Sequence, residues 1–375
     1  MKEIYMDHAA TSFPKAKGVS DAMKFYLDSV CANVGRGSYS KATDAGLTVL
    51  ETRERIADLF GLEDPRRVIF TAGNTMALNM VLSGSLKKGD RVLISSLEHN
   101  SVIRPLVQIG CELVRIPCDD CGRMLLENLP NLDDIKLCVT THCSNVCGTI
   151  QPIQALGNLL YERNIPFVVD AAQSAGHLPI HMERMHISAL CMPAHKGLLA
   201  AQGLGLLLLE KEFSKRLSPV FVGGSGSASD LDRMPSFFPD KLEAGTLNIP
   251  GIYGLFAALD SFDPTAVQKK EQEQSALFLS LLREIPNVRL MGSWEPSERV
   301  TVFSIVFTGM DQALAAIQLE ERFGLLTRCG LHCSPEAHKA LGSYPQGTVR
   351  FSFGRTTSDE EIQFVADAIK TVALS

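Results

Sequence analysis

The chain has 375 residues, of which 45% are hydrophobic and 21% are charged, and its formal net charge is −6. This length exceeds what one hydrophobic core usually serves, so we expect two domains. The acidic balance argues against a nucleic-acid-binding protein, which would carry a basic patch. We see neither an apolar run of the roughly 18 residues that span a membrane nor a secretory signal, so we expect a soluble, cytoplasmic protein.

The ten cysteines predict reduced thiols rather than a disulfide framework, because the chain is long and shows no secretory signal. Six of them form three closely spaced pairs, Cys118/Cys121, Cys143/Cys147 and Cys329/Cys333. A structural zinc site needs four converging ligands. Because these pairs are scattered along the chain, we expect no metal site, and we expect most thiols to be buried as small hydrophobic groups.

In chain order, an amphipathic helix is predicted first, over residues 42–60. Its apolar positions recur at helical spacing, at Leu47, Leu50, Ile56, Leu59 and Phe60. Short apolar runs then predict strands at 67–71, 91–95, 112–116, 136–141, 166–170, 188–192 and 205–209. Helical patterns lie between several of them, at 74–86, 99–109 and 152–163. This alternation is typical of an α/β protein with a mostly parallel sheet that helices cover on both faces.

The pattern changes after the last of these strands. Residues 222–251 are rich in Gly, Ser, Asp and Pro, lack periodicity and predict a long functional loop. Helices are then expected at 252–262, 265–285, 312–323 and 359–372, with strands at 300–307 and 348–353. We therefore expect a large domain over 15–255. A smaller α+β domain would comprise 256–375 and the N-terminal segment 1–14.

Polar residues follow several of the predicted strands. Lys196 comes after an apolar strand among small residues, where a lysine can lose its proton and form a Schiff base. Asp170 closes another buried strand and should meet a cation, because an unpaired buried carboxylate is costly. Each residue alone could be a solvated side chain or an ordinary helix cap. In an open α/β sheet, however, the carboxyl ends of the strands converge on one ligand site.

These residue types match the requirements of pyridoxal phosphate (PLP). This cofactor needs a lysine for its Schiff base and a carboxylate against its pyridine nitrogen. It also needs a ring stacked on its face, donors to its phenolic oxygen and contacts for its phosphate. The helix that follows Gly73 would offer unpaired backbone N–H groups to such an anion.

Nine stretches, in this order, resemble the class V aminotransferase family of fold-type I PLP enzymes, and in particular its cysteine desulfurase and selenocysteine lyase branch. They are YMDHAATSFPK (5–15), FTAGNTMALN (70–79), EHNS (98–101), SNVCGTIQP (144–152), VDAAQSAG (169–176), AHKGLLAAQGLG (194–205), LEAGTLNIPG (242–251), RCGLHCSPEAH (328–338) and GTVRFSFG (347–354). The resemblance covers nearly the whole chain. It implies that the large domain binds PLP and that the small domain carries a nucleophile loop.

The resemblance implies a role for each residue around the cofactor ring. Lys196 would carry PLP as a Schiff base and later move the Cα proton of the substrate. Asp170 would pair with the pyridine nitrogen, and His99 would stack on the ring. Asn145 and Gln173 would contact the phenolic oxygen or the substrate.

Further residues are implied at the phosphate and at the substrate carboxylate. The phosphate would be bound by Gly73, Asn74, Thr75 and His195. In the homodimer typical of the family, Thr246 would reach the phosphate of the partner subunit. Arg350 would bind the substrate carboxylate, a task that suits a planar guanidinium.

Cys333 is the predicted nucleophile. It lies in GLHCSP, where the family places its reactive cysteine. Independently, neighbouring Gly, Ser and Pro suggest exposure, and a following helix would favour the thiolate. The alternative is a buried, inert cysteine.

The resemblance thus implies a PLP-dependent cysteine desulfurase that converts L-cysteine to L-alanine and leaves the sulfur as a persulfide on Cys333. A second copy of the chain, in a homodimer, and a sulfur-acceptor protein are the expected partners. The alternatives are a selenocysteine lyase, or another class V transamination or β-elimination in which Cys333 takes no part. A non-catalytic sulfur or metal scaffold is a third possibility, which the presence of Lys196, Asp170, His99 and Arg350 disfavours.

Overall fold

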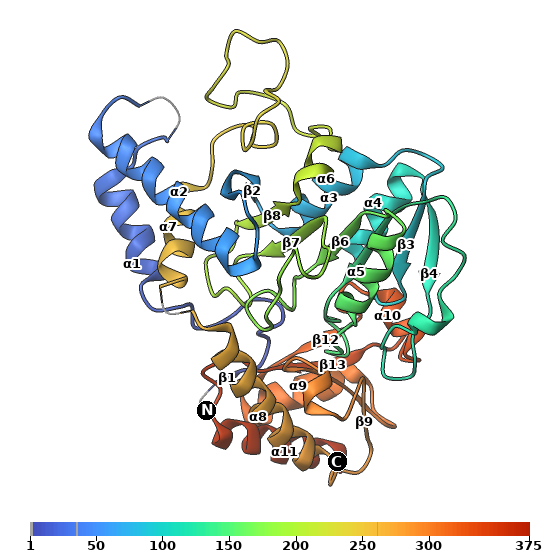
Figure 1. Ribbon diagram of the computed structural model, residues 1–375. Coiled ribbons are helices and arrows are strands. Elements are labelled where there is room, and N and C mark those ends of the chain that lie inside the picture. The colour runs from blue at the N-terminus through green and yellow to red at the C-terminus, as the bar shows by residue number, and fades with distance from the viewer. Residues whose placement is uncertain (1–2, 35–36, 261) are drawn as a thin grey trace.

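The computed structural model describes residues 3–34, 37–260 and 262–375 (Figure 1). The helices are α1 (Val19–Phe25), α2 (Ser40–Phe60), α3 (Asn74–Ser85), α4 (Asn100–Ile109), α5 (Ile153–Glu162), α6 (Lys211–Arg216), α7 (Ile249–Ala258), α8 (Pro264–Leu282), α9 (Gln312–Phe323), α10 (Pro335–Ala340) and α11 (Asp359–Ala373). Shorter helical segments cover Tyr26–Val30, Pro65–Arg67, Leu126–Asn128 and Pro296–Glu298.

The strands divide among three sheets. They are β1 (Ile4–Tyr5), β2 (Val68–Thr71), β3 (Arg91–Ser95), β4 (Glu112–Ile116), β5 (Ile135–Thr141), β6 (Phe167–Asp170), β7 (Ala189–Pro193), β8 (Gly205–Leu209), β9 (Val288–Leu290), β10 (Val302–Phe307), β11 (Leu325–Leu326), β12 (Arg328–Gly330) and β13 (Thr348–Ser352). The largest sheet has seven strands in the order β2-β8-β7-β6-β5-β3-β4. Within it β8 runs antiparallel to both of its neighbours, and the other pairs are parallel. This confirms the predicted mostly parallel sheet and brings the carboxyl ends of its parallel strands to one edge.

Both faces of this sheet are buried, because alternate residues of each strand point to opposite sides. Leu206 and Leu208 pack in one core cluster with residues of α2, α5 and α7. Leu207 and Leu209 pack in another with residues of α3 and α4. The sandwiching of the sheet by helices is therefore as predicted.

The last third of the chain builds a four-stranded sheet in the order β12-β13-β10-β9, whose paired strands are antiparallel. Its core contains Phe303 and Phe351 together with apolar residues of α8, α9 and α11. The first strand lies beside this region, since β1 pairs with β11 and Met6 enters the same core (Figure 1). The predicted smaller α+β region is thus present, while the division at residue 255 stays a prediction.

One prediction about α2 is wrong. Leu47 and Leu50 were expected on its buried face, but they are 58% and 43% exposed. The buried face carries Ala45 and Val49 instead, together with Ile56 and Phe60, which were predicted. Apolar residues lie on both sides of this helix, and helical spacing alone does not decide which side meets the core.

Other differences concern boundaries and short elements. The long loop ends earlier than expected, because α7 begins at Ile249. The helices α1 and α6 and the strands β1, β9, β11 and β12 were not predicted. The four strands have two or three residues each, which is too short for a periodic signal.

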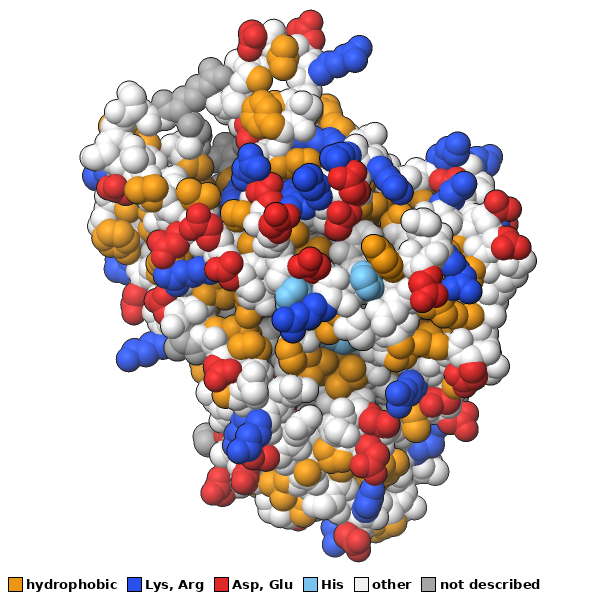
Figure 2. Space-filling model, viewed as in Figure 1, with side chains coloured by type: hydrophobic (Ala, Val, Ile, Leu, Met, Phe, Trp, Pro, Cys, Tyr) orange, Lys and Arg blue, Asp and Glu red, His pale blue; other side chains and the backbone are white. Residues whose placement is uncertain are grey.

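The segment between α6 and α7 projects from the body of the molecule, at the top of Figure 1. Figure 2 shows hydrophobic side chains on the surface of this projection. The exposed apolar residues in it are Val220, Phe221, Val222, Leu231 and Phe237. Figure 2 also shows basic and acidic side chains mixed over this face of the molecule, without a continuous basic patch. Within the described parts of the chain, no helix combines the length and the apolar character that a membrane crossing needs.

Candidate active site

A cavity of about 750 Å³ lies at the carboxyl edge of the large sheet, facing the β12–β13 region. All but one of the twelve predicted site residues line it. They are Gly73, Asn74, Thr75, His99, Asn145, Asp170, Gln173, His195, Lys196, Cys333 and Arg350. The convergence expected from the ends of parallel strands is therefore present.

Lys196 follows β7, and its side chain is partly accessible from the cavity. Burial lowers the pKa of its amine to about 8, and the nearby charge of Arg350 acts in the same direction. An amine with this pKa is neutral in a large fraction of molecules near pH 8, and the neutral form is the one that attacks a carbonyl carbon.

Asp170 ends β6 and is only 2% exposed. Its Oδ1 accepts hydrogen bonds from Asn74 Nδ2 (2.8 Å) and from the backbone N–H of Ala172 (3.0 Å). The sequence suggested a cationic partner, but both of these donors are neutral. A cation near this carboxylate is the amine of Lys196, on which the charge of Asp170 acts.

The turn between β2 and α3 forms a second wall. Gly73 precedes α3, and a Cβ at this position would meet no heavy atom within 4 Å. The backbone at the start of α3 is thus open to the cavity, and the first N–H groups of a helix favour an anion. Thr75 is exposed beside it.

His99 caps α4 and is held in one orientation. Its Nδ1 accepts a hydrogen bond from the Ser101 backbone N–H at 3.0 Å and lies 2.7 Å from Ser101 Oγ. Burial lowers the pKa of the imidazole, although the charge of Asp170 opposes the shift. A neutral, fixed ring on the cavity wall suits stacking against a flat ligand.

His195 is oriented by the N-terminal segment. Its Nδ1 lies 3.0 Å from Thr11 Oγ1, and its backbone carbonyl accepts a hydrogen bond from Lys15 Nζ at 2.9 Å. The same amine donates to Thr11 and Ser12, both at 3.1 Å. Burial and the charges of Lys196 and Lys15 lower the pKa of His195 to about 4. The ring therefore stays neutral and leaves Nε2 for a ligand.

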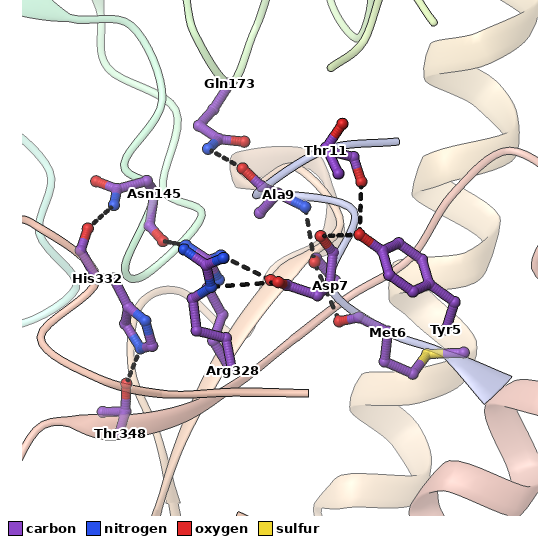
Figure 3. Close-up of polar contacts among 12 residues, drawn as sticks. Tyr5, Met6, Asp7, Ala9, Thr11, Asn145, Gln173, Arg328, His332 and Thr348 are labelled. Atoms are coloured by element: carbon purple, nitrogen blue, oxygen red, sulfur yellow. Dashed lines mark hydrogen bonds and ion pairs between the residues drawn. The ribbon is translucent and has the colours of Figure 1, made fainter. Parts of the chain in front are cut away.

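The segment that carries Cys333 is ordered and bonded to Asn145. Asn145 Nδ2 donates to the His332 carbonyl at 2.7 Å (Figure 3). Asn145 Oδ1 accepts from Ser334 Oγ, also at 2.7 Å. The Cys333 carbonyl accepts from the backbone N–H of Asn100 at 2.9 Å. His332 and Cys333 both have positive φ, at 49° and 57°, a conformation that side chains disfavour and that the surrounding bonds must hold. Cys333 itself is exposed.

Arg350 is 2% exposed and is already paired within the chain. Its Nη2 lies 2.9 Å from Asp7 Oδ1, and its Nη1 donates to the Asn145 carbonyl at 3.1 Å. The other carboxylate oxygen of Asp7 accepts from Arg328 Nε at 3.2 Å (Figure 3). Two guanidinium groups thus share one carboxylate at the cavity wall. On the same side, Gln173 Nε2 donates to the Ala9 carbonyl at 2.9 Å.

Sequence analysis missed Asp7 and Arg328 as parts of this wall. Asp7 stands in the N-terminal stretch YMDHAATSFPK. An acidic residue in one family motif could have been considered as a partner for Arg350, the predicted carboxylate-binding arginine of another. Arg328 opens the quoted stretch that contains Cys333. Its pairing with Arg350 across β12 and β13 depends on a strand of three residues, which the sequence does not reveal.

Thr246 is the predicted site residue that does not line this cavity. It is exposed and lies in the segment that leads from the projecting loop into α7. Its predicted contact lies on a partner subunit and stays a prediction.

The ten cysteines are free thiols. Among the residues that the structure describes, no group of three or more His, Cys, Asp or Glu side chains could hold a metal ion. Cys333 is exposed, and five other cysteines are exposed or only partly buried: Cys31, Cys111, Cys118, Cys121 and Cys329. The expectation that most thiols are buried therefore holds only for Cys138, Cys143, Cys147 and Cys191.

The sequence of residues 4–365 matches the family described as aminotransferase class-V. The chain belongs to this family. A protein named probable cysteine desulfurase in Methanothermobacter thermautotrophicus is 30% identical, over 99% of this chain and 94% of that relative. Another protein with that name, in Vibrio cholerae, is 30% identical over 98% of this chain and 92% of its own length.

The fold comparison agrees with the family. The apo structure of a cysteine desulfurase from Thermococcus onnurineus NA1 superposes with a TM-score of 0.92 at 29% identity. The match covers 99% of this chain and 95% of the other. The class-V fold, with its large mixed sheet and its smaller C-terminal sheet, is therefore established for this chain, and the predicted family resemblance is confirmed.

Proposed function

We propose that this class-V enzyme is a PLP-dependent cysteine desulfurase, which converts L-cysteine to L-alanine and leaves the sulfur as a persulfide on Cys333. The observation that carries the proposal is that an exposed cysteine and a lysine of lowered pKa line the same cavity. The names of the full-length relatives support the same activity.

The residues present fit PLP, on which the class-V family depends. Lys196 would hold its aldehyde carbon, and the buried carboxylate of Asp170, bonded only to neutral donors, suits a protonated pyridine nitrogen. The open backbone after Gly73 suits the phosphate, with Asn74, Thr75 and His195 beside it. When bound, PLP supplies an electron sink for the bonds at Cα of an amino-acid substrate.

The protein's own residues would then divide the work. Arg350 would bind the substrate carboxylate through its guanidinium and so orient the amino acid. Lys196, once released from the cofactor, would take the proton from Cα and return it. His99 would keep the cofactor ring in place, and Asn145 and Gln173 would set the distances around the substrate.

Cys333 would carry out the sulfur transfer. Its thiolate attacks the sulfur of the substrate, the carbon–sulfur bond breaks, and the electron pair of that bond remains on the three-carbon product. Protonation of this product gives alanine, and Cys333 retains the transferred sulfur as a persulfide.

A homodimer would complete the site. Exposed apolar residues lie on the projecting loop and in the region of α1 and α2, where Phe25, Leu27, Leu47 and Leu50 are more than 40% exposed, although others lie elsewhere on the surface. Several exposed apolar residues on one segment favour an interface there. Thr246 lies at the end of the projecting loop, from which it could reach the phosphate in a partner subunit.

The first experiment is alanine formation from L-cysteine, with a thiol reductant, for the wild type and Cys333→Ala. We expect the wild type to turn over and the variant to lose that activity by about 10³-fold while still binding PLP. Equal activities would show that Cys333 is not the nucleophile and would favour transamination or β-elimination. If neither protein makes alanine from cysteine but the wild type makes it from selenocysteine, the enzyme is a selenocysteine lyase.

A further inference from the structure

A second hollow, of about 430 Å³, lies beside the active-site cavity along α3 and α4. Cys333 belongs to the walls of both, and so do Thr75, His99 and Ser101. The thiol of Cys333 therefore stands at the junction between the place where substrate would bind and a groove that leads away from it. We call this groove the α3/α4 groove.

The remaining wall of the α3/α4 groove combines polar side chains with the apolar Pro105 and Ile109, and it carries one full charge. Asn79 and Ser83 of α3 face Arg104 and Gln108 of α4, and no acidic residue appears among the described residues that line it. Arg104 is exposed and forms no ion pair with any described residue. The positive charge of Arg104 helps to lower the pKa of the His99 imidazole at the cavity mouth.

The position of Arg104 relative to Cys333 is fixed by the backbone. The N–H of Asn100, the first residue of α4, donates to the carbonyl of Cys333 at 2.9 Å. Arg104 follows Asn100 by four residues and so lies one helical turn away, about 6 Å along the same face. A ligand in the groove could therefore place one group at the sulfur of Cys333 and an anionic group at Arg104.

We propose, resting on the function proposed above, that the α3/α4 groove binds the sulfur acceptor, and that this acceptor is a low-molecular-weight thiol with a carboxylate. The carboxylate would pair with Arg104. The thiolate would attack the terminal sulfur of the Cys333 persulfide. As the new sulfur–sulfur bond forms, the old one breaks and its electron pair leaves on the Cys333 thiolate. The acceptor departs as a persulfide, and no external oxidant or reductant is needed.

The dimensions favour a small molecule over a docked protein. A hollow of this volume is within the range of small-molecule sites. Its lining combines polar side chains with apolar surface, and it contains no Phe, Tyr or Trp among the described residues, whereas a stable protein interface has an apolar core with aromatic anchors. The single unpaired guanidinium matches one carboxylate.

The test separates sulfur release from persulfide formation. The protein is first treated with L-cysteine in the absence of thiol, and the persulfide on Cys333 is quantified by mass spectrometry. It is then mixed with 3-mercaptopropionate, 2-mercaptoethanol or cysteamine, which are anionic, neutral and cationic, and the rate of persulfide loss is compared at equal thiolate concentration. We expect the anionic thiol to react about fivefold faster than the neutral one, and more so at low salt, since exposed ion pairs are modest and screened.

Arg104→Gln should remove this preference, and Arg104→Glu should reverse it toward cysteamine, while both variants form the persulfide as the wild type does. Arg163→Gln, which changes an exposed arginine at the end of α5, is the matched control and should keep the preference. Equal rates for the three thiols, or an unchanged preference in Arg104→Gln, would overturn the proposal. The proposal would also be overturned if only a cysteine-bearing protein, and none of the three small thiols, removed the sulfur from Cys333.

A second measurement does not depend on desulfurase activity. The unreactive thioether 3-(methylthio)propionate should slow alkylation of Cys333 by iodoacetamide in the wild type, and 2-(methylthio)ethanol should do so several-fold less. Arg104→Gln should abolish the difference. If no persulfide forms but this protection is seen, the desulfurase proposal fails and the anion-binding groove stands. If protection is absent, the groove proposal fails whatever the enzyme's activity.

Discussion

Two walls of the active-site cavity are built in different ways. The carboxyl edge of the large sheet supplies Lys196, Asp170 and His99, each within a few residues of a strand end. The opposite wall pairs Asp7 with Arg350, which are 343 positions apart in the chain. It holds Cys333 in a turn that other segments keep in place.

This difference separates the residues that carry out the reaction from the residues that hold reacting groups in place. The sheet edge presents its groups through strand-to-helix turns, so it forms wherever the sheet forms. The opposite wall exists only when the N-terminal segment and the β12–β13 region meet the sheet. Substitutions of Lys196 and Asp170 at the sheet edge, or of Cys333 itself, should therefore abolish the reaction. Substitutions of the residues that hold Cys333 and Arg350 in the opposite wall should change how substrate and thiol are held.

The largest effect is expected at the sheet edge. Lys196→Ala should lower alanine formation by at least about 10³-fold, because it removes both the Schiff-base amine and the group that moves the Cα proton. The visible absorbance of a lysine-bound cofactor should also disappear. Lys88→Ala, an exposed lysine elsewhere, is the control and should behave as the wild type. Substantial turnover in Lys196→Ala would mean that another group carries the chemistry.

In the opposite wall, Asn145→Ala should release the Cys333 segment, since both polar atoms of its side chain bond that segment. We expect persulfide formation to slow by about 10- to 100-fold, because displacing a nucleophile by about 1 Å lowers the reaction rate by up to about 100-fold. Exchange of the substrate Cα proton with solvent, followed by NMR, should fall less than persulfide formation.

Ser334→Ala is the matched variant for this prediction, because it removes only one of the two bonds and leaves Asn145 in place. It should slow persulfide formation by a few-fold. If Ser334→Ala has no effect and Asn145→Ala lowers proton exchange and persulfide formation equally, Asn145 acts on substrate or cofactor rather than on the Cys333 segment.

Asp7→Asn should weaken the same wall by leaving two guanidinium groups without a shared counter-charge. Because Arg350 is buried, we expect a loss of unfolding free energy on the order of 2 kcal/mol, measured by urea denaturation. Asp21→Asn, at an exposed site in α1, should change stability by only a few tenths of a kcal/mol and serves as the control. Equal stability of the two variants would contradict this account of the wall.

The smallest effect is expected on the pH dependence of stability, at Glu98, which precedes His99 at the sheet edge. Burial raises the pKa of this carboxyl to about 8, although hydrogen bonds from Ser95 and from the Thr141 backbone oppose the shift. The folded state therefore holds a proton that the unfolded state releases above about pH 4.5, so this residue contributes less stability as pH rises from about 4.5 to 8. Glu98→Gln, which is neutral at every pH, should not share that loss.

We expect the melting temperature of Glu98→Gln to rise relative to the wild type by about 1–3 °C between pH 5 and pH 8. Scanning calorimetry of both proteins at the two pH values would measure this. A difference that does not change with pH would show that Glu98 is ionised in the folded protein.

The groups of the sheet edge could be predicted because their signals are local. An apolar strand followed by Lys196, or one that ends in Asp170, is visible in a few consecutive letters, and parallel strands bring such ends together. The partners of these groups could not be predicted in the same way. The cation that Asp170 was expected to meet stays a prediction, and its neutral donors, Asn74 and Ala172, were not predicted. Which neutral donors reach a carboxylate depends on the exact path of neighbouring turns.

By itself the sequence determined the alternation of strands and helices, the two-faced burial of the large sheet, and the family with its lysine, aspartate and cysteine. The period of the apolar residues is enough for the first two, whereas the family rests on the resemblance of the nine quoted stretches. Only the tertiary structure decided which side of α2 faces the core, and how Asp7 joins Arg328 to Arg350. It also decided that Cys333 opens onto the α3/α4 groove as well as the cavity. These features depend on contacts between segments far apart in the chain, and no local pattern encodes such contacts.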